Sequence, residues 1–145
     1  MLKVLLVEDN LSDRELIHKS LGNRAVIKEA TSGEQAFEIL SEEKFDCILL
    51  DSHLPDCDSG TFINTIRRQG ICTSVVTISE LGDELLAVRS IKLGSAGHMP
   101  KKKINGGFFD FLSTTIQEEA FQRKECELIA DVNVKIRRKL QEYAI

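Results

Sequence analysis

The most constraining feature of this sequence is the alternation of short apolar runs with segments of helical period. The apolar runs have the length of strands and lie at 3–7, 25–30, 46–50, 74–78 and 97–101. A helical segment follows each run, at about 12–21, 33–41, 59–69, 83–93 and from about 106 onward. This alternation is typical of β–α units that form a parallel sheet. We therefore predict an α/β fold with a doubly wound five-stranded parallel sheet flanked by five helices. If the strand order is 2-1-3-4-5, the first and third strands are neighbours in this sheet.

Local signals support the helix boundaries. Three glycines stand where helices should end, and glycine readily adopts the left-handed backbone that a helix end commonly requires: Gly22, Gly70 and Gly94. Two helix starts show the spacing of a capping box, in which Ser or Thr precedes Glu by three residues: Ser12 with Glu15, and Thr31 with Glu34. The pattern therefore predicts compact helices with defined ends.

Two of the predicted strands can be assigned places in the sheet. The run Cys47–Leu50 is apolar on both faces of the strand pleat, so it should be central, with helices on both sides. Pro100 lies in the weakest run. Because proline cannot donate a backbone hydrogen bond to a neighbouring strand, that run belongs at an edge.

Length, charge and hydropathy limit the class of protein. The 145 residues suit one domain with an appendage. No apolar run approaches the ~18 residues that a membrane span needs, and the N-terminus lacks the pattern of a secretory signal, so we expect a cytoplasmic protein without membrane association. The net charge of −4 argues against direct nucleic-acid binding, in spite of the basic run at 100–104.

The four cysteines are widely spaced along the chain: Cys47, Cys57, Cys72 and Cys126. No two of them form a Cys-x-x-Cys pair, and no clustered histidines complete a zinc site. We therefore predict four reduced thiols in a reducing compartment.

Acidic residues follow two of the predicted strands. Glu8 and Asp9 come directly after the first strand, and Asp51 closes the third. In an open parallel sheet the binding crevice lies beyond the carboxyl ends of the strands, where the strand order reverses. Strands one and three would be neighbours there, so the three carboxylates should converge. Crowded carboxylates favour a hard divalent cation with oxygen ligands, and we predict Mg²⁺.

A hydroxyl group and an ammonium group are expected at the same edge. Thr77 lies near the carboxyl end of the fourth strand, and Lys101 lies at the end of the fifth. Together with the carboxylates, they are the groups needed to hold a phosphoryl group that is transferred to a carboxylate oxygen.

Over roughly residues 1–118 the sequence resembles the receiver domain of bacterial two-component response regulators, and it is similar to the single-domain chemotaxis type. The resemblance rests on "LLVEDN" with its acid pair, on "ILLDSHLPDCDSG" with its Asp-x-x-x-Pro-x-x-x-x-Gly spacing, on Thr77, and on "GSAGHMPK", which ends in Lys101. The order and spacing of these motifs together are highly specific. The resemblance implies a flavodoxin-like fold and a switch that is no enzyme beyond promoting its own phosphorylation and dephosphorylation.

The resemblance also implies a phosphoacceptor and a metal site. Asp51 would accept a phosphoryl group from a phosphohistidine on a sensor histidine kinase or a histidine phosphotransfer protein. Asp9, Asp51 and the backbone carbonyl of His53 would bind Mg²⁺, and Glu8 would reach the ion through water.

A relay to the protein surface is implied as well. Thr77 would hydrogen-bond one phosphoryl oxygen, and Lys101 would pair with another. Movement of Thr77, together with His98 at the family's switch position, would then signal to the face formed by the fourth helix, fifth strand and fifth helix.

Several positions depart from the family pattern. Lys102 stands where the family usually has a proline after a cis peptide bond, so we expect a trans loop. His98 replaces the usual switch aromatic, Tyr or Phe. Ile78 is bulkier than the usual small residue and would slow phosphoryl access or hydrolysis unless its side chain turns away. His53 and Ser79 occupy the two positions that tune dephosphorylation in the family.

Residues 119–145 form a predicted helical extension, because they contain neither Gly nor Pro. Four apolar residues have coiled-coil spacing over about two heptads: Ile129, Val132, Ile136 and Tyr143. Three interpretations stay open, namely a linker or oligomerising helix that would support a homodimer, a helix folded back on the domain, and a frayed tail. The chain is either a stand-alone regulator that acts on a downstream protein, or the front of a longer chain with a fused output domain.

Two rival functions remain. A degenerate receiver would bind a partner without phosphorylation; Ile78, Lys102 and His98 motivate it, and the intact set of acidic, hydroxyl and lysine residues argues against it. A flavodoxin-like cofactor carrier would need a hydroxyl- or glycine-rich phosphate loop after the first strand, but residues 7–13 are acidic instead. The cofactor carrier is therefore the weakest hypothesis.

Overall fold

The predicted α/β architecture is confirmed in the computed structural model, which describes residues 1–80 and 84–144. Its five parallel strands are β1 (Leu2–Val7), β2 (Ala25–Ala30), β3 (Cys47–Asp51), β4 (Ser74–Ser79) and β5 (Gly97–Pro100). The helices are α1 (Leu11–Leu21), α2 (Gly33–Glu42), α3 (Ser59–Arg68), α4 (Glu84–Lys92), α5 (Phe108–Glu118) and α6 (Ala120–Tyr143), with short 3₁₀ helices at Gly22–Arg24 and Lys101–Lys103. The predicted start of the fourth helix, at residue 83, lies outside the described residues.

The strand order is β2-β1-β3-β4-β5, as predicted. All five residues of β3 are buried, which agrees with its central place. β5, with Pro100 as its last residue, lies at an edge beside β4. Because β1 and β3 are adjacent, with Val7 opposite Leu50, their carboxyl ends open at the same point of the sheet.

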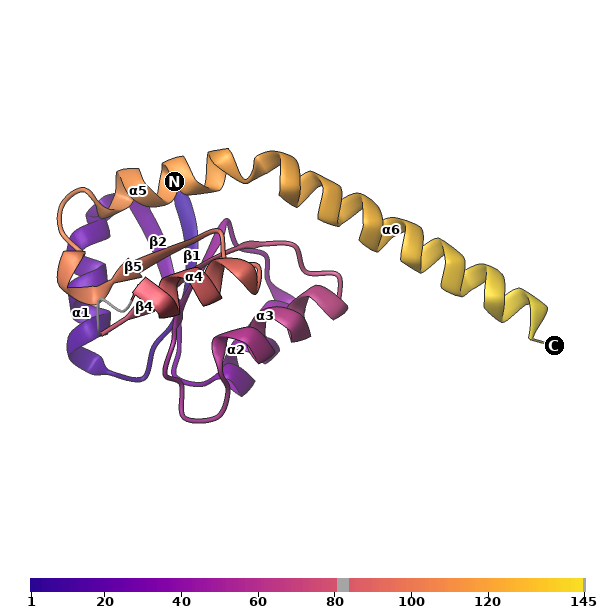
Figure 1. Ribbon diagram of the computed structural model, residues 1–145, viewed down its shortest axis with the longest axis horizontal. Coiled ribbons are helices and arrows are strands. Elements are labelled where there is room, and N and C mark those ends of the chain that lie inside the picture. The colour runs from indigo at the N-terminus through magenta and orange to yellow at the C-terminus, as the bar shows by residue number, and fades with distance from the viewer. Residues whose placement is uncertain (81–83, 145) are drawn as a thin grey trace.

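Two apolar layers hold the helices against the sheet. On one face Leu5 and Leu50 of the sheet pack with Ala36 of α2 and Phe62 of α3. On the other face, Leu49 and other strand residues pack with the core residues of α1 and α5: Ile17, Leu21, Phe108 and Leu112. Helices therefore cover both faces of the sheet (Figure 1), and the burial of these side chains supplies the main driving force for folding.

The three predicted helix ends are confirmed, because Gly22, Gly70 and Gly94 all have positive φ angles. Both predicted capping boxes are wrong. The N-cap of α1 is Asn10, whose side chain accepts a hydrogen bond from the Asp13 N–H, and the N-cap of α2 is Ser32. Each helix therefore begins at a neighbouring polar residue that caps equally well.

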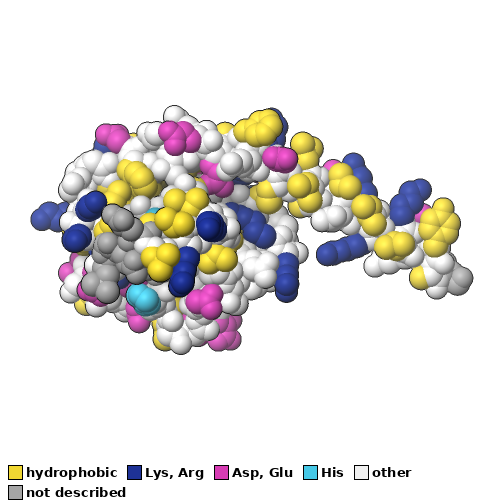
Figure 2. Space-filling view, viewed as in Figure 1, with side chains coloured by type: hydrophobic (Ala, Val, Ile, Leu, Met, Phe, Trp, Pro, Cys, Tyr) yellow, Lys and Arg dark blue, Asp and Glu magenta, His cyan; other side chains and the backbone are white. Residues whose placement is uncertain are grey.

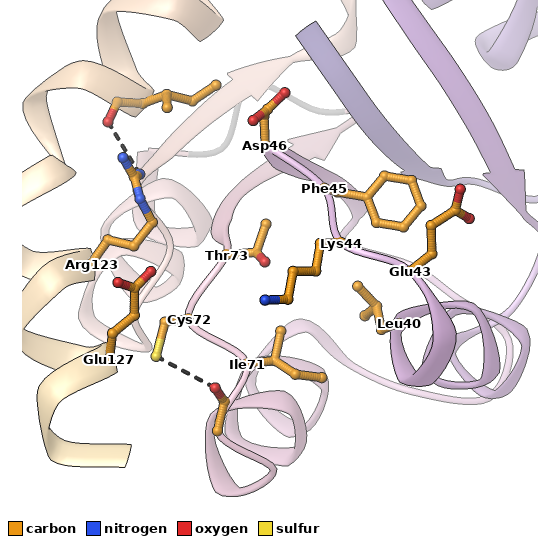
Figure 3. Close-up of a pocket in the computed structure, with 12 residues that line it drawn as sticks. Leu40, Glu43, Lys44, Phe45, Asp46, Ile71, Cys72, Thr73, Arg123 and Glu127 are labelled. Carbon is orange, nitrogen blue, oxygen red and sulfur yellow. Dashed lines mark hydrogen bonds between the residues drawn. The ribbon is translucent and has the colours of Figure 1, made fainter. Parts of the chain in front are cut away.

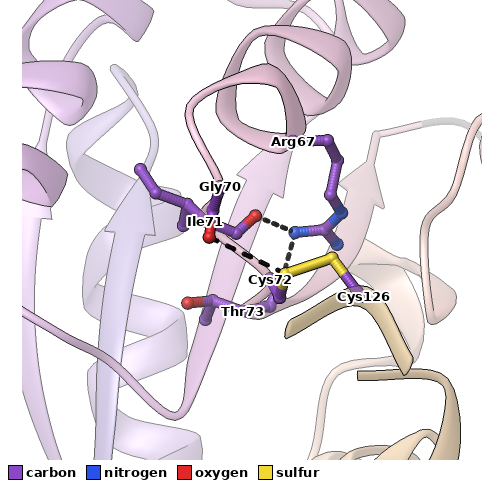
Figure 4. The surroundings of a disulfide bond; sticks show 6 residues. All are labelled: Arg67, Gly70, Ile71, Cys72, Thr73 and Cys126. Atoms are coloured by element: carbon purple, nitrogen blue, oxygen red, sulfur yellow. Dashed lines mark hydrogen bonds between the residues drawn. A yellow bond between two sulfur atoms is a disulfide. The ribbon is translucent and has the colours of Figure 1, made fainter. Parts of the chain in front are cut away.

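The last helix, α6, continues from α5 and projects beyond the domain (Figure 1). Its first turns are anchored: Arg123 Nη1 donates a hydrogen bond to Ser74 Oγ at 2.7 Å, and Cys126 forms a disulfide with Cys72 (Figure 4). None of the described helices is long and apolar enough to cross a membrane.

The disulfide corrects the prediction that all four cysteines are reduced. Cys72 and Cys126 are 54 residues apart in sequence, and their Cα atoms lie 5.9 Å apart. Cys47 and Cys57 are free thiols. Neither cysteine spacing nor periodicity reveals this pairing, because it depends on how α6 packs beside the segment that precedes β4.

Candidate functional site

The predicted acidic cluster forms where β1 and β3 end. Oxygen atoms of Glu8, Asp9 and Asp51, one from each, all lie within 4.8 Å of one another. Glu8 and Asp51 are buried, whereas Asp9 is exposed at the surface. The parallel pairing of β1 with β3 brings these residues together, because both strands leave the sheet at the same edge.

Lys101 reaches into this cluster from the end of β5. Its Nζ lies 2.8 Å from Glu8 Oε2 and 3.6 Å from Asp51 Oδ1. It also lies 2.7 Å from Asp13 Oδ2. Lys101 is 8% exposed, so these ion pairs are shielded from water and salt. The three buried groups and the partly exposed Asp13 form one electrostatic unit.

Asp13 is a member of the site that sequence reasoning missed. The capping-box prediction began the first helix at Ser12, whereas α1 begins at Leu11 behind its N-cap, Asn10. This start places Asp13 in the first turn, where its backbone N–H binds the Asn10 side chain and its carboxylate binds Lys101. The segment "EDNLSD" contains the signal, since an acid in the first turn of a helix beside the site can reach into it.

Burial and charge shift two pKa values in this unit. Burial raises the pKa of Glu8 to about 7, and the negative charge of Asp51 adds to the rise, although the hydrogen bond from Lys101 opposes it. Burial disfavours the charge of Lys101, but the hydrogen bonds to Asp13 and Glu8 and the field of Asp51 prevail and raise its pKa. Lys101 is therefore a permanent cation, and Glu8 is a carboxyl group that a further cation would ionise.

The loop after β3 is held by helix capping. Asp56 accepts hydrogen bonds from the backbone N–H groups of Gly33 and Glu34 at the start of α2, and these bonds lower its pKa. Asp58 is the N-cap of α3. His53 lies exposed in this loop, and its N–H donates to Asp51 Oδ1 at 3.2 Å. Two of the acidic residues in "DSHLPDCDSG" therefore position the loop rather than extend the acidic cluster.

The side chains of Thr77 and His98 are hydrogen-bonded to each other. Thr77 Oγ1 lies 2.6 Å from His98 Nδ1, and Ser79 Oγ lies 2.9 Å from His98 Nε2. Both hydroxyl residues are fully buried in β4, opposite β5. Burial lowers the pKa of His98, which favours the neutral ring; a neutral ring donates through one nitrogen and accepts through the other. The imidazole thus joins the predicted phosphoryl-binding hydroxyl to the edge strand.

Replacing His98 with Phe should destabilise the protein, because an aromatic ring remains at this position but both hydrogen bonds of the imidazole are lost. We expect the free energy of unfolding to fall by about 1–2 kcal/mol in urea denaturation. The matched control is His18→Phe, which removes an exposed hydrogen bond to Glu29 and should change stability little. An unchanged midpoint for His98→Phe would show that the imidazole does not support β5.

Ile78 turns into the core. Its side chain is fully buried in the layer that contains Met99 and Phe108, while its backbone pairs with Asp51. The large side chain of Ile78, at a position where the family usually has a small residue, therefore packs against α5. The backbone at Lys102 has no cis peptide bond, in line with the expectation, and none occurs elsewhere in the described residues.

A separate pocket of about 390 Å³ opens at the other end of the sheet (Figure 3). Its lining includes Phe45 and Asp46 before β3, Thr73 before β4, and Arg123 of α6. These residues precede their strands, whereas the acidic cluster follows its strands. The pocket therefore belongs to the seam between α6 and the domain and is remote from the acidic cluster.

Residues 4–121 match the family described as the response regulator receiver domain. The match covers most of the chain and includes the acidic cluster, Thr77 and Lys101. The chain belongs to the response regulator receiver family. Receiver domains are non-enzymatic signalling modules that act as phosphorylation switches of two-component systems and work with histidine kinases. The acidic cluster of this receiver suits that function.

Similar proteins agree with this family. The transcriptional regulatory protein SrrA of Staphylococcus aureus is 30% identical over 100 residues, which cover 68% of this chain and 41% of SrrA. The chain therefore spans less than half the length of the curated relatives that it matches. The BeF3-activated N-terminal receiver domain of Klebsiella pneumoniae RstA is 26% identical, with a TM-score of 0.70 over 79% of this chain and 97% of that one. The Francisella response regulator 1452 receiver domain is 21% identical, with a TM-score of 0.72 over 81% of this chain and 98% of that one, and shares the fold.

Proposed function

We propose that Asp51 is the phosphoacceptor of this receiver. The observation that carries the proposal is the buried carboxylate of Asp51 at the end of β3, between the acid pair of β1 and the ammonium group of Lys101. A carboxylate oxygen of Asp51 attacks the phosphorus of a phosphohistidine. The new P–O bond forms as the P–N bond to the imidazole breaks, which leaves an acyl phosphate on Asp51 and a free histidine on the donor.

The groups that would hold the phosphoryl group are bound elsewhere before phosphorylation. Lys101 pairs with Glu8 and Asp13, and the Thr77 hydroxyl bonds His98. A new dianion on Asp51 competes for the Thr77 hydroxyl, because a charge-assisted hydrogen bond is stronger than the neutral one to His98. The added negative charge also attracts Lys101 more strongly than the Asp51 carboxylate does. Phosphorylation would therefore exchange one set of contacts for another and release His98, which is how the switch signals to the α4–β5–α5 face.

Mg²⁺ fits the acidic cluster. Asp9 and Asp51 would bind the ion with the backbone carbonyl of His53, and Glu8 would act through water. The fit rests on the crowding of three carboxylates, of which Glu8 has a raised pKa that a cation would lower again. When bound, the ion neutralises phosphoryl oxygens during transfer.

The affinity for Mg²⁺ should depend on pH through Glu8. Because its pKa is about 7 in the metal-free protein, Glu8 is neutral below that pH and ionised above it. Titration of Mg²⁺ by calorimetry should show an affinity that rises with pH through this range and then levels off. The Glu8→Gln variant should bind more weakly and lose the dependence; an equally steep dependence in that variant would contradict the assignment.

The phosphoacceptor proposal is tested by incubating the protein with Mg²⁺ and a small-molecule phosphodonor and weighing the intact chain. An adduct that forms with Mg²⁺, but does not form when the metal is chelated before the phosphodonor is added, supports the switch. Absence of an adduct would favour the alternative, a degenerate receiver that binds its partner without phosphorylation. RstA was solved with BeF3, an analogue of a phosphoryl group, and this supports the first outcome by analogy.

The partners and domain limits that we propose follow from the same site. A sensor histidine kinase or histidine phosphotransfer protein would donate the phosphoryl group, with 1–118 as the receiver unit and 119–145 as an extension. The output would be either a downstream protein, as in a stand-alone regulator of the chemotaxis type, or a fused output domain, as the greater length of SrrA suggests. The exposed apolar residues of α6 support a homodimer.

A further inference from the structure

The α6 helix carries a row of exposed apolar side chains over its whole length (Figure 2). The stripe, as we call it, consists of five residues that are each at least half exposed: Phe121, Leu128, Val132, Ile136 and Tyr143. Ile129 and Leu140 widen it on one side. Among isolated surface residues such exposure is ordinary, but a row of apolar residues that repeats along one helix face marks an interaction surface.

The stripe points away from the domain. Arg123, which bonds Ser74, lies nine residues before Val132, which is half a turn around the helix at ~100° per residue. Cys126 anchors α6 to Cys72 from a similar side. A second helix can therefore approach the stripe without meeting the receiver to which α6 is attached.

The spacing of the stripe is symmetric about Val132. Leu128 and Ile136 lie four residues on either side of it, and Phe121 and Tyr143 lie eleven residues on either side. Between them, seven residues on either side of Val132, stand one acid and one base, Glu125 and Lys139. The repeat of eleven residues matches an almost straight helix better than the heptad does, so the face stays in line along α6.

Charge along α6 is asymmetric in a complementary way. The exposed part of its first half carries one basic and three acidic residues: Lys124, Glu125, Glu127 and Asp131. Its second half carries four basic residues and one acidic residue: Lys135, Arg137, Arg138, Lys139 and Glu142. A parallel pair would bring like charges together, with Glu125 beside Glu125 and Lys139 beside Lys139. An antiparallel pair would place each acidic half against a basic half.

We propose that two copies of this chain associate through α6 as an antiparallel, two-fold symmetric helix pair centred on Val132. Val132 of each copy then meets Val132 of the other, Leu128 meets Ile136, and Phe121 meets Tyr143. Glu125 of each copy faces Lys139 of the other, so the interface holds two equivalent ion pairs. Such an interface is self-complementary and closed. The proposal rests on the homodimer proposed above and specifies its geometry, and it does not depend on phosphoryl transfer.

The test is a charge-swap cycle on the full chain, without Mg²⁺ or phosphodonor, read by sedimentation equilibrium. We expect the wild type to dimerise, and Glu125→Lys and Lys139→Glu each to weaken the dimer about tenfold, because each places like charges opposite one another twice. The double variant Glu125→Lys/Lys139→Glu should return to the wild-type constant. Arg138→Glu, about 120° around the helix from Val132, is the matched control and should change the constant far less.

Two outcomes would overturn the proposal. If the wild-type chain stays monomeric, the homodimer is excluded. If the double variant dimerises more weakly than either single variant, the antiparallel arrangement is excluded. A second measurement is independent of charge: in a Cys57→Ser background, Leu128→Cys and Ile136→Cys chains should form an intermolecular disulfide when mixed, and neither should do so alone. Crosslinking of each alone would establish a parallel pair instead. Neither result bears on whether Asp51 is phosphorylated, so failure of one proposal leaves the other standing.

Discussion

The Asp51→Asn variant is expected to take up no phosphoryl group under conditions in which the wild type is modified. The substitution keeps the shape of a side chain that is 4% exposed, so the packing around β3 should survive. It replaces the nucleophilic carboxylate oxygen with a neutral amide, and it removes one of the three carboxylates that would attract Mg²⁺. Both effects act in the same direction, and the loss should be complete within detection by intact mass.

The matched control for this variant is Asp56→Asn. Asp56 is an exposed acid in the same loop, but its carboxylate caps α2 and lies outside the acidic cluster. The control should still be phosphorylated, with a loss of stability of about 1 kcal/mol from the weaker cap. An undiminished adduct on Asp51→Asn would place the phosphoacceptor elsewhere, and circular dichroism of each variant separates misfolding from lost chemistry.

The Cys126→Ser variant is expected to lose about 4 kcal/mol of unfolding free energy under non-reducing conditions. The disulfide to Cys72 closes a long loop, since the two residues are 54 apart in sequence. In the chain-entropy description, a crosslink of this length removes much of the conformational freedom of the unfolded chain. Urea denaturation measures the change, and wild-type protein treated with a reductant should fall to the same level as the variant.

Cys57→Ser is the control for this measurement, because Cys57 is a half-buried free thiol outside the disulfide. It should leave the midpoint nearly unchanged. Thiol titration of the denatured wild type should detect two free cysteines, and detection of four would contradict the bond. In Cys126→Ser the first turns of α6 would still be anchored by the hydrogen bond from Arg123 to Ser74. The contributions of the disulfide and of this hydrogen bond can therefore be measured separately.

The acidic cluster was predictable once the strand order was taken as 2-1-3-4-5. Parallel strands that alternate with helices leave their carboxyl ends at one edge of the sheet, so Glu8, Asp9 and Asp51 had to meet once β1 and β3 were neighbours. The glycine helix ends at Gly22, Gly70 and Gly94 were predictable too, because positive φ angles favour glycine strongly. The two N-caps were misplaced, since adjacent Ser, Thr and Asn residues compete for the same position.

The sequence by itself determined the α/β fold, the convergence of the three carboxylates and the helical character of the extension. These follow from periodicity and from the rule that parallel strands end at the same edge of a sheet. Only the tertiary structure decided the bond between Cys72 and Cys126, the pairing of Asp13 with Lys101 and the contact of His98 with Thr77 and Ser79. Each of these joins residues that are remote in sequence and depends on side-chain direction within a packed interior. Local patterns carry no information about such distances until the sheet and helices are placed against one another.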